Sequence, residues 1–88
     1  LEAFLNKVED QLASLRVAAQ TGDMHRVTHE AHSIKGGAWN LEARPLGEAA
    51  RQLEEAARQE SKGDVALCLD ALQDCFEAFK RSAEPLVR

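Results

Sequence analysis

The string HSIKGGAW, residues 32–39, brings together a histidine, a lysine and two adjacent glycines. Apolar residues at steps of three and four, from Met24 to Leu41, predict that this string lies in an amphipathic helix. At about 100° per residue, His32 falls on an exposed face away from the apolar stripe, and Lys35 can reach a group attached to the ring. A neutral imidazole is a good nucleophile near neutral pH. We therefore interpret His32 as a phosphoryl acceptor and Lys35 as the cation that offsets the phosphoryl charge.

The glycine pair is unfavourable in a helix, because each glycine destabilises a helix interior by about 1 kcal/mol relative to alanine. Gly36 shares the face of His32, where a missing side chain would let another protein approach the imidazole. Gly37 points about 100° further round the helix and could instead allow close packing. We assign both glycines to a partner-binding surface, with packing as the alternative for Gly37.

Three histidines, His25, His29 and His32, share one face with spacings of four and three, which suggests a different class of function. Histidines at i and i+4 can chelate zinc or copper. No cysteine joins this face, a fourth ligand is missing, and the Lys35 cation would disfavour a bound metal. The sequence thus predicts no metal site and keeps a histidine-cluster module as an alternative. A purely structural helical adaptor is a further alternative, but it leaves the glycine pair unexplained.

The elements that position these residues follow from composition and periodicity. The chain has 88 residues, 44% of them hydrophobic, which is enough for one domain with one core. Four amphipathic segments predict helices at roughly 2–20, 23–42, 45–60 and 64–83. Short junctions favour antiparallel neighbours, so we predict an all-α, antiparallel up-down-up-down four-helix bundle that occupies residues 1–88.

The predicted junctions between helices are marked by short sequence patterns. Gly22-Asp23 and Gly63-Asp64 each place a helix-ending glycine before an aspartate suited to cap the next helix. Arg44-Pro45 forms the middle junction, because proline is tolerated in a first helical turn and disfavours helix at its predecessor.

Charge and motif content exclude several functions. The net charge of −4 argues against a nucleic-acid partner, and no apolar run reaches the ~18 residues that a membrane span needs. No Gly-rich phosphate loop is present, so we expect no ATP site, no cofactor and no enzymatic turnover of its own. Cys68 and Cys75 lie too far apart in one helix to bridge, which favours a reducing, cytoplasmic location.

The segments AHSIKGGAWNLEA and LGEAARQLEEAAR resemble the histidine-containing phosphotransfer (HPt) domain of bacterial phosphorelays. The resemblance covers residues 23–58, and the helix count extends it over the chain. It implies that the domain takes a phosphoryl group from an aspartate of a response-regulator receiver domain and hands it to another receiver, without binding ATP. The domain would belong to a hybrid sensor kinase, with kinase and receiver domains in the same polypeptide, or to a standalone carrier. The string is also similar to the phosphoacceptor domain of chemotaxis-type histidine kinases.

The resemblance implies roles at matching positions. His32 would be phosphorylated on the ring nitrogen distal to the backbone, and Lys35 would steady the phosphoryl oxygens. Glu54 would hydrogen-bond the other ring nitrogen and fix the tautomer. The partner-binding surface would comprise Gly36, Gly37, His29 and Trp39.

Some residues depart from the family pattern or have a second interpretation. Trp39 stands where the family usually has a small residue, and it either widens the docking rim or lies against a neighbouring helix. Glu42 stands where a glycine is common. Glu54 could instead form surface ion pairs with Arg51 and Arg58, at i−3 and i+4.

Overall fold

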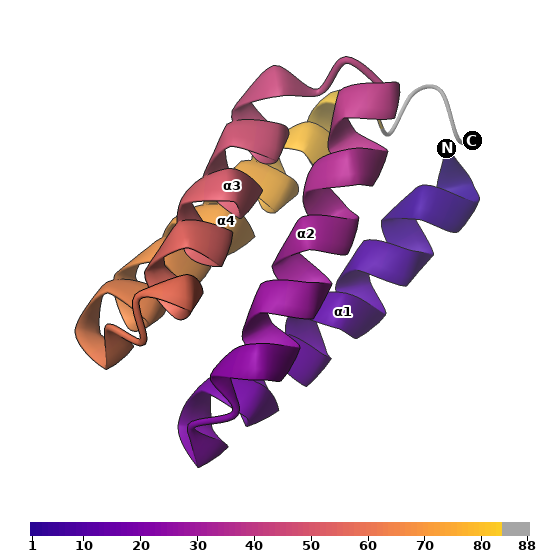
Figure 1. Ribbon diagram of the computed structural model, residues 1–88. Coiled ribbons are helices and arrows are strands. Elements are labelled where there is room, and N and C mark those ends of the chain that lie inside the picture. Colours follow the sequence, from indigo (N-terminus) through magenta and orange to yellow (C-terminus); the bar gives the residue numbers. More distant parts are fainter. Residues whose placement is uncertain (84–88) are drawn as a thin grey trace.

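A computed structural model describes residues 1–83 of the chain as four helices with no strand among them. They are α1 (Glu2–Thr21), α2 (Met24–Asn40), α3 (Arg44–Arg58) and α4 (Lys62–Ala83). Successive helices run in opposite directions along the long axis of the molecule (Figure 1). The predicted all-α, up-down-up-down architecture is confirmed. None of the helices described combines the length and the hydrophobicity that a membrane crossing requires.

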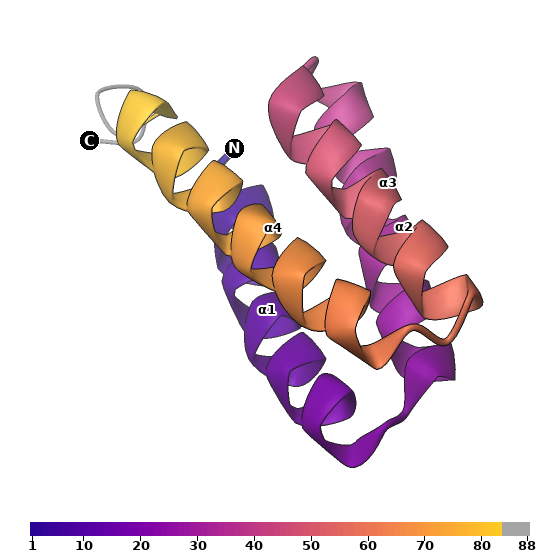
Figure 2. The same cartoon turned by 90° about the vertical axis from the view of Figure 1, so that its left-hand side faces the viewer.

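The helices form a closed ring in which each packs against its neighbours in sequence and α1 returns to α4 (Figure 2). The most extensive contact is between α2 and α3, followed by that between α3 and α4. Small side chains on the buried face of α3 allow this close approach, because interaxial distance depends on the residues at the contact. These residues are Gly47, Ala49, Ala50, Ala56 and Ala57.

Every helix contributes large residues to one core, as the predicted apolar stripes require. The largest fully buried side chains include Leu15, Ile34, Leu46, Leu53, Leu69, Leu72 and Phe76. Leu41 is the exception, because the periodicity predicts it in the buried stripe and it is exposed. The reason is that α2 ends at Asn40, which puts Leu41 beyond the last helical turn.

The junction between α1 and α2 has the ending and the cap that Gly22-Asp23 predicts. Gly22 takes a left-handed conformation at φ 78°, and its N–H and that of Asp23 bond back to the carbonyls of Ala19 and Ala18. The Asp23 side chain then caps α2 by accepting a hydrogen bond from the Arg26 N–H at 3.1 Å. This pattern is a Schellman ending followed directly by an N-cap.

The expected role of Gly63-Asp64 is wrong, because Gly63 lies inside α4. Helix α3 ends earlier, at Arg58, and Glu60 takes the left-handed position at φ 54°. The N–H groups of Glu60 and Ser61 close another Schellman ending on the carbonyls of Ala57 and Ala56. Hydrogen bonding of the last turn therefore outweighs the steric cost of a non-glycine residue in this conformation.

The junction between α2 and α3 repeats this ending, with Glu42 at φ 57°. Left-handed backbone at this position gives a reason for glycine to be common there, because glycine has no Cβ to clash. Pro45 lies in the first turn of α3, as predicted. Arg44, however, is already helical, so the expected break at that residue is shifted by one position.

Candidate functional site

His32 lies on α2 at the rim of its contact with α3, with its side chain 64% exposed. Its Nδ1 atom is 3.0 Å from Oε2 of Glu54 on α3. Nε2, on the opposite side of the ring, has no hydrogen-bond partner within residues 1–83. The ring is therefore held by its inner nitrogen and presents its outer nitrogen to solvent.

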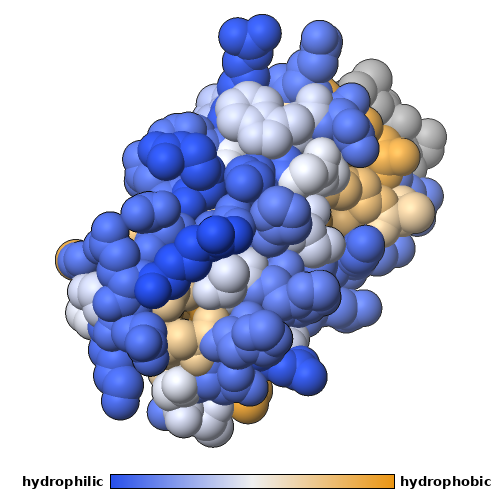
Figure 3. All heavy atoms as spheres, viewed as in Figure 1, coloured by the Kyte–Doolittle hydropathy of each residue, from blue (hydrophilic) through white to orange (hydrophobic). Residues whose placement is uncertain are grey.

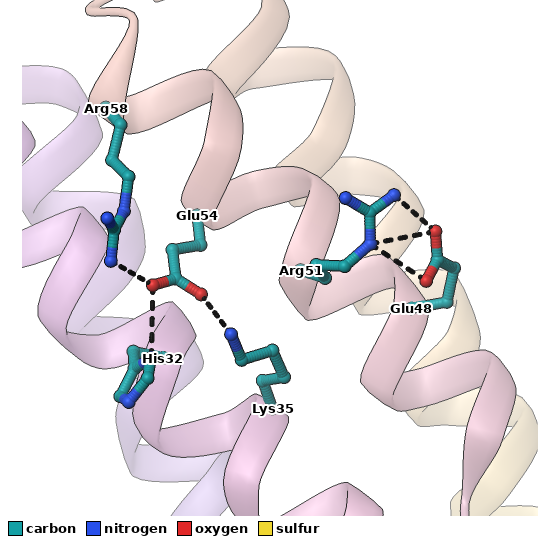
Figure 4. Close-up of polar contacts among 6 residues, drawn as sticks. All are labelled: His32, Lys35, Glu48, Arg51, Glu54 and Arg58. Atoms are coloured by element: carbon teal, nitrogen blue, oxygen red, sulfur yellow. Dashed lines mark hydrogen bonds and ion pairs between the residues drawn. The ribbon is translucent and has the colours of Figure 1, made fainter.

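Glu54 is the centre of the polar cluster (Figure 4), and its side chain is buried, with only 6% exposed. Oε2 receives hydrogen bonds from His32 Nδ1 and, at 2.7 Å, from Nη2 of Arg58, while Lys35 Nζ lies 2.8 Å from Oε1. Burial by itself raises the pKa of the Glu54 carboxyl, but the hydrogen bonds from Lys35, Arg58 and His32 outweigh it and lower the pKa to about 2. Glu54 is thus a carboxylate at neutral pH.

An ionised Glu54 fixes the tautomer of the neutral histidine ring. A carboxylate can only accept hydrogen bonds, so the proton of neutral His32 lies on Nδ1 and the lone pair on Nε2. The cluster therefore places a nucleophilic nitrogen at the surface of α2.

Buried neighbours hold the two partners in register. Ala31, next to His32, and Leu53, next to Glu54, are both fully buried. Ile34 is likewise buried beside Lys35. Because these residues fix the rotation of α2 and α3, the polar side chains beside them meet along the rim of the helix contact.

Lys35 is engaged with Glu54 and does not face the open side of the histidine. Its side chain is 24% exposed and lines a surface hollow of about 240 Å³ together with Arg51, Glu54, Glu55 and Arg58. His32 lines a different hollow of about 230 Å³, which we call the His32 hollow; its other residues are His25, Thr28, His29 and Arg58. Lys35 would therefore have to leave Glu54 or turn its flexible side chain to contact a group on Nε2.

The two glycines have different surroundings. A Cβ atom on Gly36 would meet nothing within 4 Å, whereas one on Gly37 would lie 2.7 Å from Cε1 of Phe4 on α1. Gly36 is exposed beside His32, and Gly37 allows α1 to pack closely on α2. The surroundings of Gly37 thus match its packing alternative, and those of Gly36 match an open face beside His32.

We predict opposite effects of alanine at these two positions. Gly36→Ala should stabilise the fold by about 1 kcal/mol through helix propensity alone. Gly37→Ala should be about 1–3 kcal/mol less stable than Gly36→Ala, because its Cβ displaces the Phe4 ring, which packs edge-on against Phe79. Urea denaturation of the two variants measures this difference. Equal stabilisation of both would show that Phe4 yields freely and that Gly37 has no packing role.

Trp39 lies against the neighbouring helix and remains 43% exposed. A Cβ atom on Gly47 of α3 would be 3.1 Å from the indole ring, so the ring covers the α3 backbone where a side chain is missing. This position agrees with the interpretation that Trp39 lies against a neighbouring helix. The exposed part of the ring still borders the α2 surface, two turns beyond His32.

Arg58 is the site residue that sequence reasoning missed. The sequence offers the ion pair of Glu54 with Arg58 only as an alternative to a role for Glu54 beside His32, yet Glu54 binds both side chains on the same oxygen. The i+4 spacing indicates the contact of Arg58 with Glu54, but its closeness to His32 depends on how α2 and α3 pack. Arg51 instead forms its ion pair with Glu48, at 2.6 Å, and does not bind Glu54.

The histidine row does not form a metal centre. Within the described part of the chain, no group of three histidine, cysteine, aspartate or glutamate side chains is placed to hold a metal ion. The metal-binding alternative therefore has no geometric support.

The α2 and α3 side of the molecule is mostly hydrophilic, with small apolar areas between charged groups (Figure 3).

The sequence was compared with protein families, curated proteins and solved structures. A family model described as the Hpt domain matches residues 1–82. No curated protein and no solved structure matches the chain.

Proposed function

Because the chain belongs to the Hpt domain family, we propose that His32 accepts a phosphoryl group from a receiver-domain aspartyl phosphate and passes it to another receiver aspartate. Hpt domains carry out histidine phosphotransfer in phosphorelay signalling and act as phosphoryl carriers. The specific assignment rests on one observation, the hydrogen bond from His32 Nδ1 to the Glu54 carboxylate. It supports the proposal because a neutral ring that donates from Nδ1 keeps its lone pair on Nε2, and the His32 side chain is exposed.

The first transfer would proceed by attack of the Nε2 lone pair on phosphorus. The N–P bond forms as the P–O bond to the receiver aspartate breaks, and the aspartate leaves as a carboxylate with the bonding electron pair. The His32 ring gains positive charge in this step while Nδ1 keeps its proton. Glu54 compensates for that charge through the hydrogen bond it already accepts.

The same contact favours onward transfer. When the second receiver aspartate attacks phosphorus, the N–P bond breaks and its electron pair returns to Nε2, which restores the neutral ring. A ring that retains the Nδ1 proton is the better leaving group because it departs uncharged. One buried carboxylate thus serves both directions, as a carrier requires.

The surface around His32 would receive the receiver domain. Gly36 leaves the space beside the ring open, His29 lines the same hollow as His32, and Trp39 is a further exposed residue of the same helix. Lys35 would offset phosphoryl charge after turning from Glu54. We place this exchange in a cytoplasmic phosphorelay that includes a histidine kinase.

The direct test is transfer of label from a receiver. A receiver domain charged with radiolabelled acetyl phosphate is mixed with the chain, and the chain is then isolated and counted. We expect label on the chain that is lost in acid and retained in base, as expected for a phosphohistidine. A chain that stays unlabelled while several different receivers are charged would contradict the proposal.

Gly36→Leu should weaken receiver docking about tenfold or more without unfolding the protein, because it fills open space beside His32. The matched control is Gly63→Leu, since a Cβ at Gly63 on α4 also meets nothing within 4 Å. Receiver affinity is measured by titration calorimetry and stability by circular dichroism. Equal affinity of the two variants would refute the access role of Gly36.

A further inference from the structure

Arg58 has two contacts that place it beside the His32 ring. It is the last residue of α3, and its Nη2 donates to the Glu54 oxygen that also binds His32 Nδ1. It also lines the His32 hollow. Two donors on one oxygen lie close together, so the guanidinium group is beside the imidazole (Figure 4).

The guanidinium group has spare donor capacity. Arginine carries five N–H donors, and the structure commits one Arg58 nitrogen to Glu54. The side chain is 60% exposed, so the remaining donors are available to a ligand. A planar guanidinium suits phosphoryl oxygens because it can donate to two of them at once.

Lys35 is less well placed than Arg58 to bind phosphoryl oxygens on His32. It is bound to the other oxygen of Glu54 and lines the other hollow, whereas Arg58 lines both. A phosphoryl group on Nε2 would add about two negative charges beside the imidazole. Among the residues that line the His32 hollow, Arg58 is the one that carries a permanent positive charge.

We propose that Arg58 is a phosphoryl-binding residue, which donates hydrogen bonds to the phosphoryl oxygens carried on His32 Nε2. This inference rests on the proposed function of His32. Arg58 takes no part in bond making or breaking and moves no proton. It stabilises the phosphorylated form of the chain relative to the phosphorylated receiver while it keeps its contact with Glu54.

The test compares Arg58→Gln with Arg51→Gln. Both arginines lie on α3, but Arg51 pairs with Glu48 and stays outside the His32 hollow. Each chain is brought to equilibrium with a receiver charged by labelled acetyl phosphate, and the share of label on chain and receiver is measured. Arg58→Gln should shift this ratio towards the receiver by roughly five- to tenfold, as expected for loss of a charge-assisted hydrogen bond at a partly exposed site. Arg51→Gln should not shift it.

A second measurement separates direct contact from an effect through Glu54. Nitrogen-15 NMR of His32 reports which ring nitrogen carries the proton, and we expect Nδ1 to keep it in unphosphorylated Arg58→Gln. An unchanged label ratio, or a lost Nδ1 preference in that variant, would overturn the phosphoryl-binding role. Wild-type chain that accepts no label would instead refute the proposed function of His32, so the two failures are distinguishable.

Discussion

His32→Gln is expected to abolish phosphoryl acceptance while the fold is retained. Glutamine has an amide in place of the imidazole lone pair, so no nucleophile remains at the surface of α2. The position is exposed and glutamine is a good helix former, so the free energy of unfolding should change by no more than about 0.5 kcal/mol. The amide of the new side chain can also still donate to Glu54. Radiolabel transfer from a charged receiver and thermal denaturation measure the two effects.

The matched control for this variant is His25→Gln. His25 is exposed on the same helix, so it tests whether any accessible histidine accepts label. We expect full labelling of His25→Gln and background labelling of His32→Gln. Undiminished labelling of His32→Gln would remove His32 from the proposed function and direct attention to another acceptor.

Glu54→Ala should slow phosphoryl transfer about 10- to 100-fold, the range known for losing the hydrogen-bond partner that orients a metal-binding histidine. Two consequences follow from losing the carboxylate. The Nδ1 proton is no longer fixed, so part of the population carries its proton on Nε2 and cannot attack. The positive charge that develops on the ring also loses its counter-charge.

The fold should survive this substitution. Lys35 and Arg58 lose their partner, but both side chains reach solvent in the structure and can be hydrated there. Rapid-quench measurement of the transfer rate, with circular dichroism for folding, separates chemistry from stability.

Two further variants sharpen the test of Glu54. Glu54→Gln keeps an oxygen that can accept the Nδ1 proton but removes the charge, so its rate should fall between wild type and Glu54→Ala. Glu55→Ala removes the exposed neighbouring glutamate and should transfer at the wild-type rate. If Glu54→Ala and Glu55→Ala transfer equally fast, Glu54 would revert to an ion-pair partner without a role in transfer.

The sequence by itself determined the helices and the faces they present. Steps of three and four between Leu5, Val8, Leu12 and Leu15 set the buried side of α1, and the same periodicity placed His32 opposite the apolar stripe of α2. These features are local, because the pitch of one helix fixes the angle between its residues. The string around His32 also identified the family that the chain matches.

The tertiary structure alone decided which side chains from different helices meet. His32 and Glu54 are 22 residues apart, and their contact depends on how α2 and α3 are rotated and shifted against each other. The same packing set Gly37 against Phe4 and bound Lys35 to Glu54. No periodicity within one helix carries that information, because it arises from the fit of two surfaces. The sequence therefore singled out His32, and helix packing determined which side chains contact its ring.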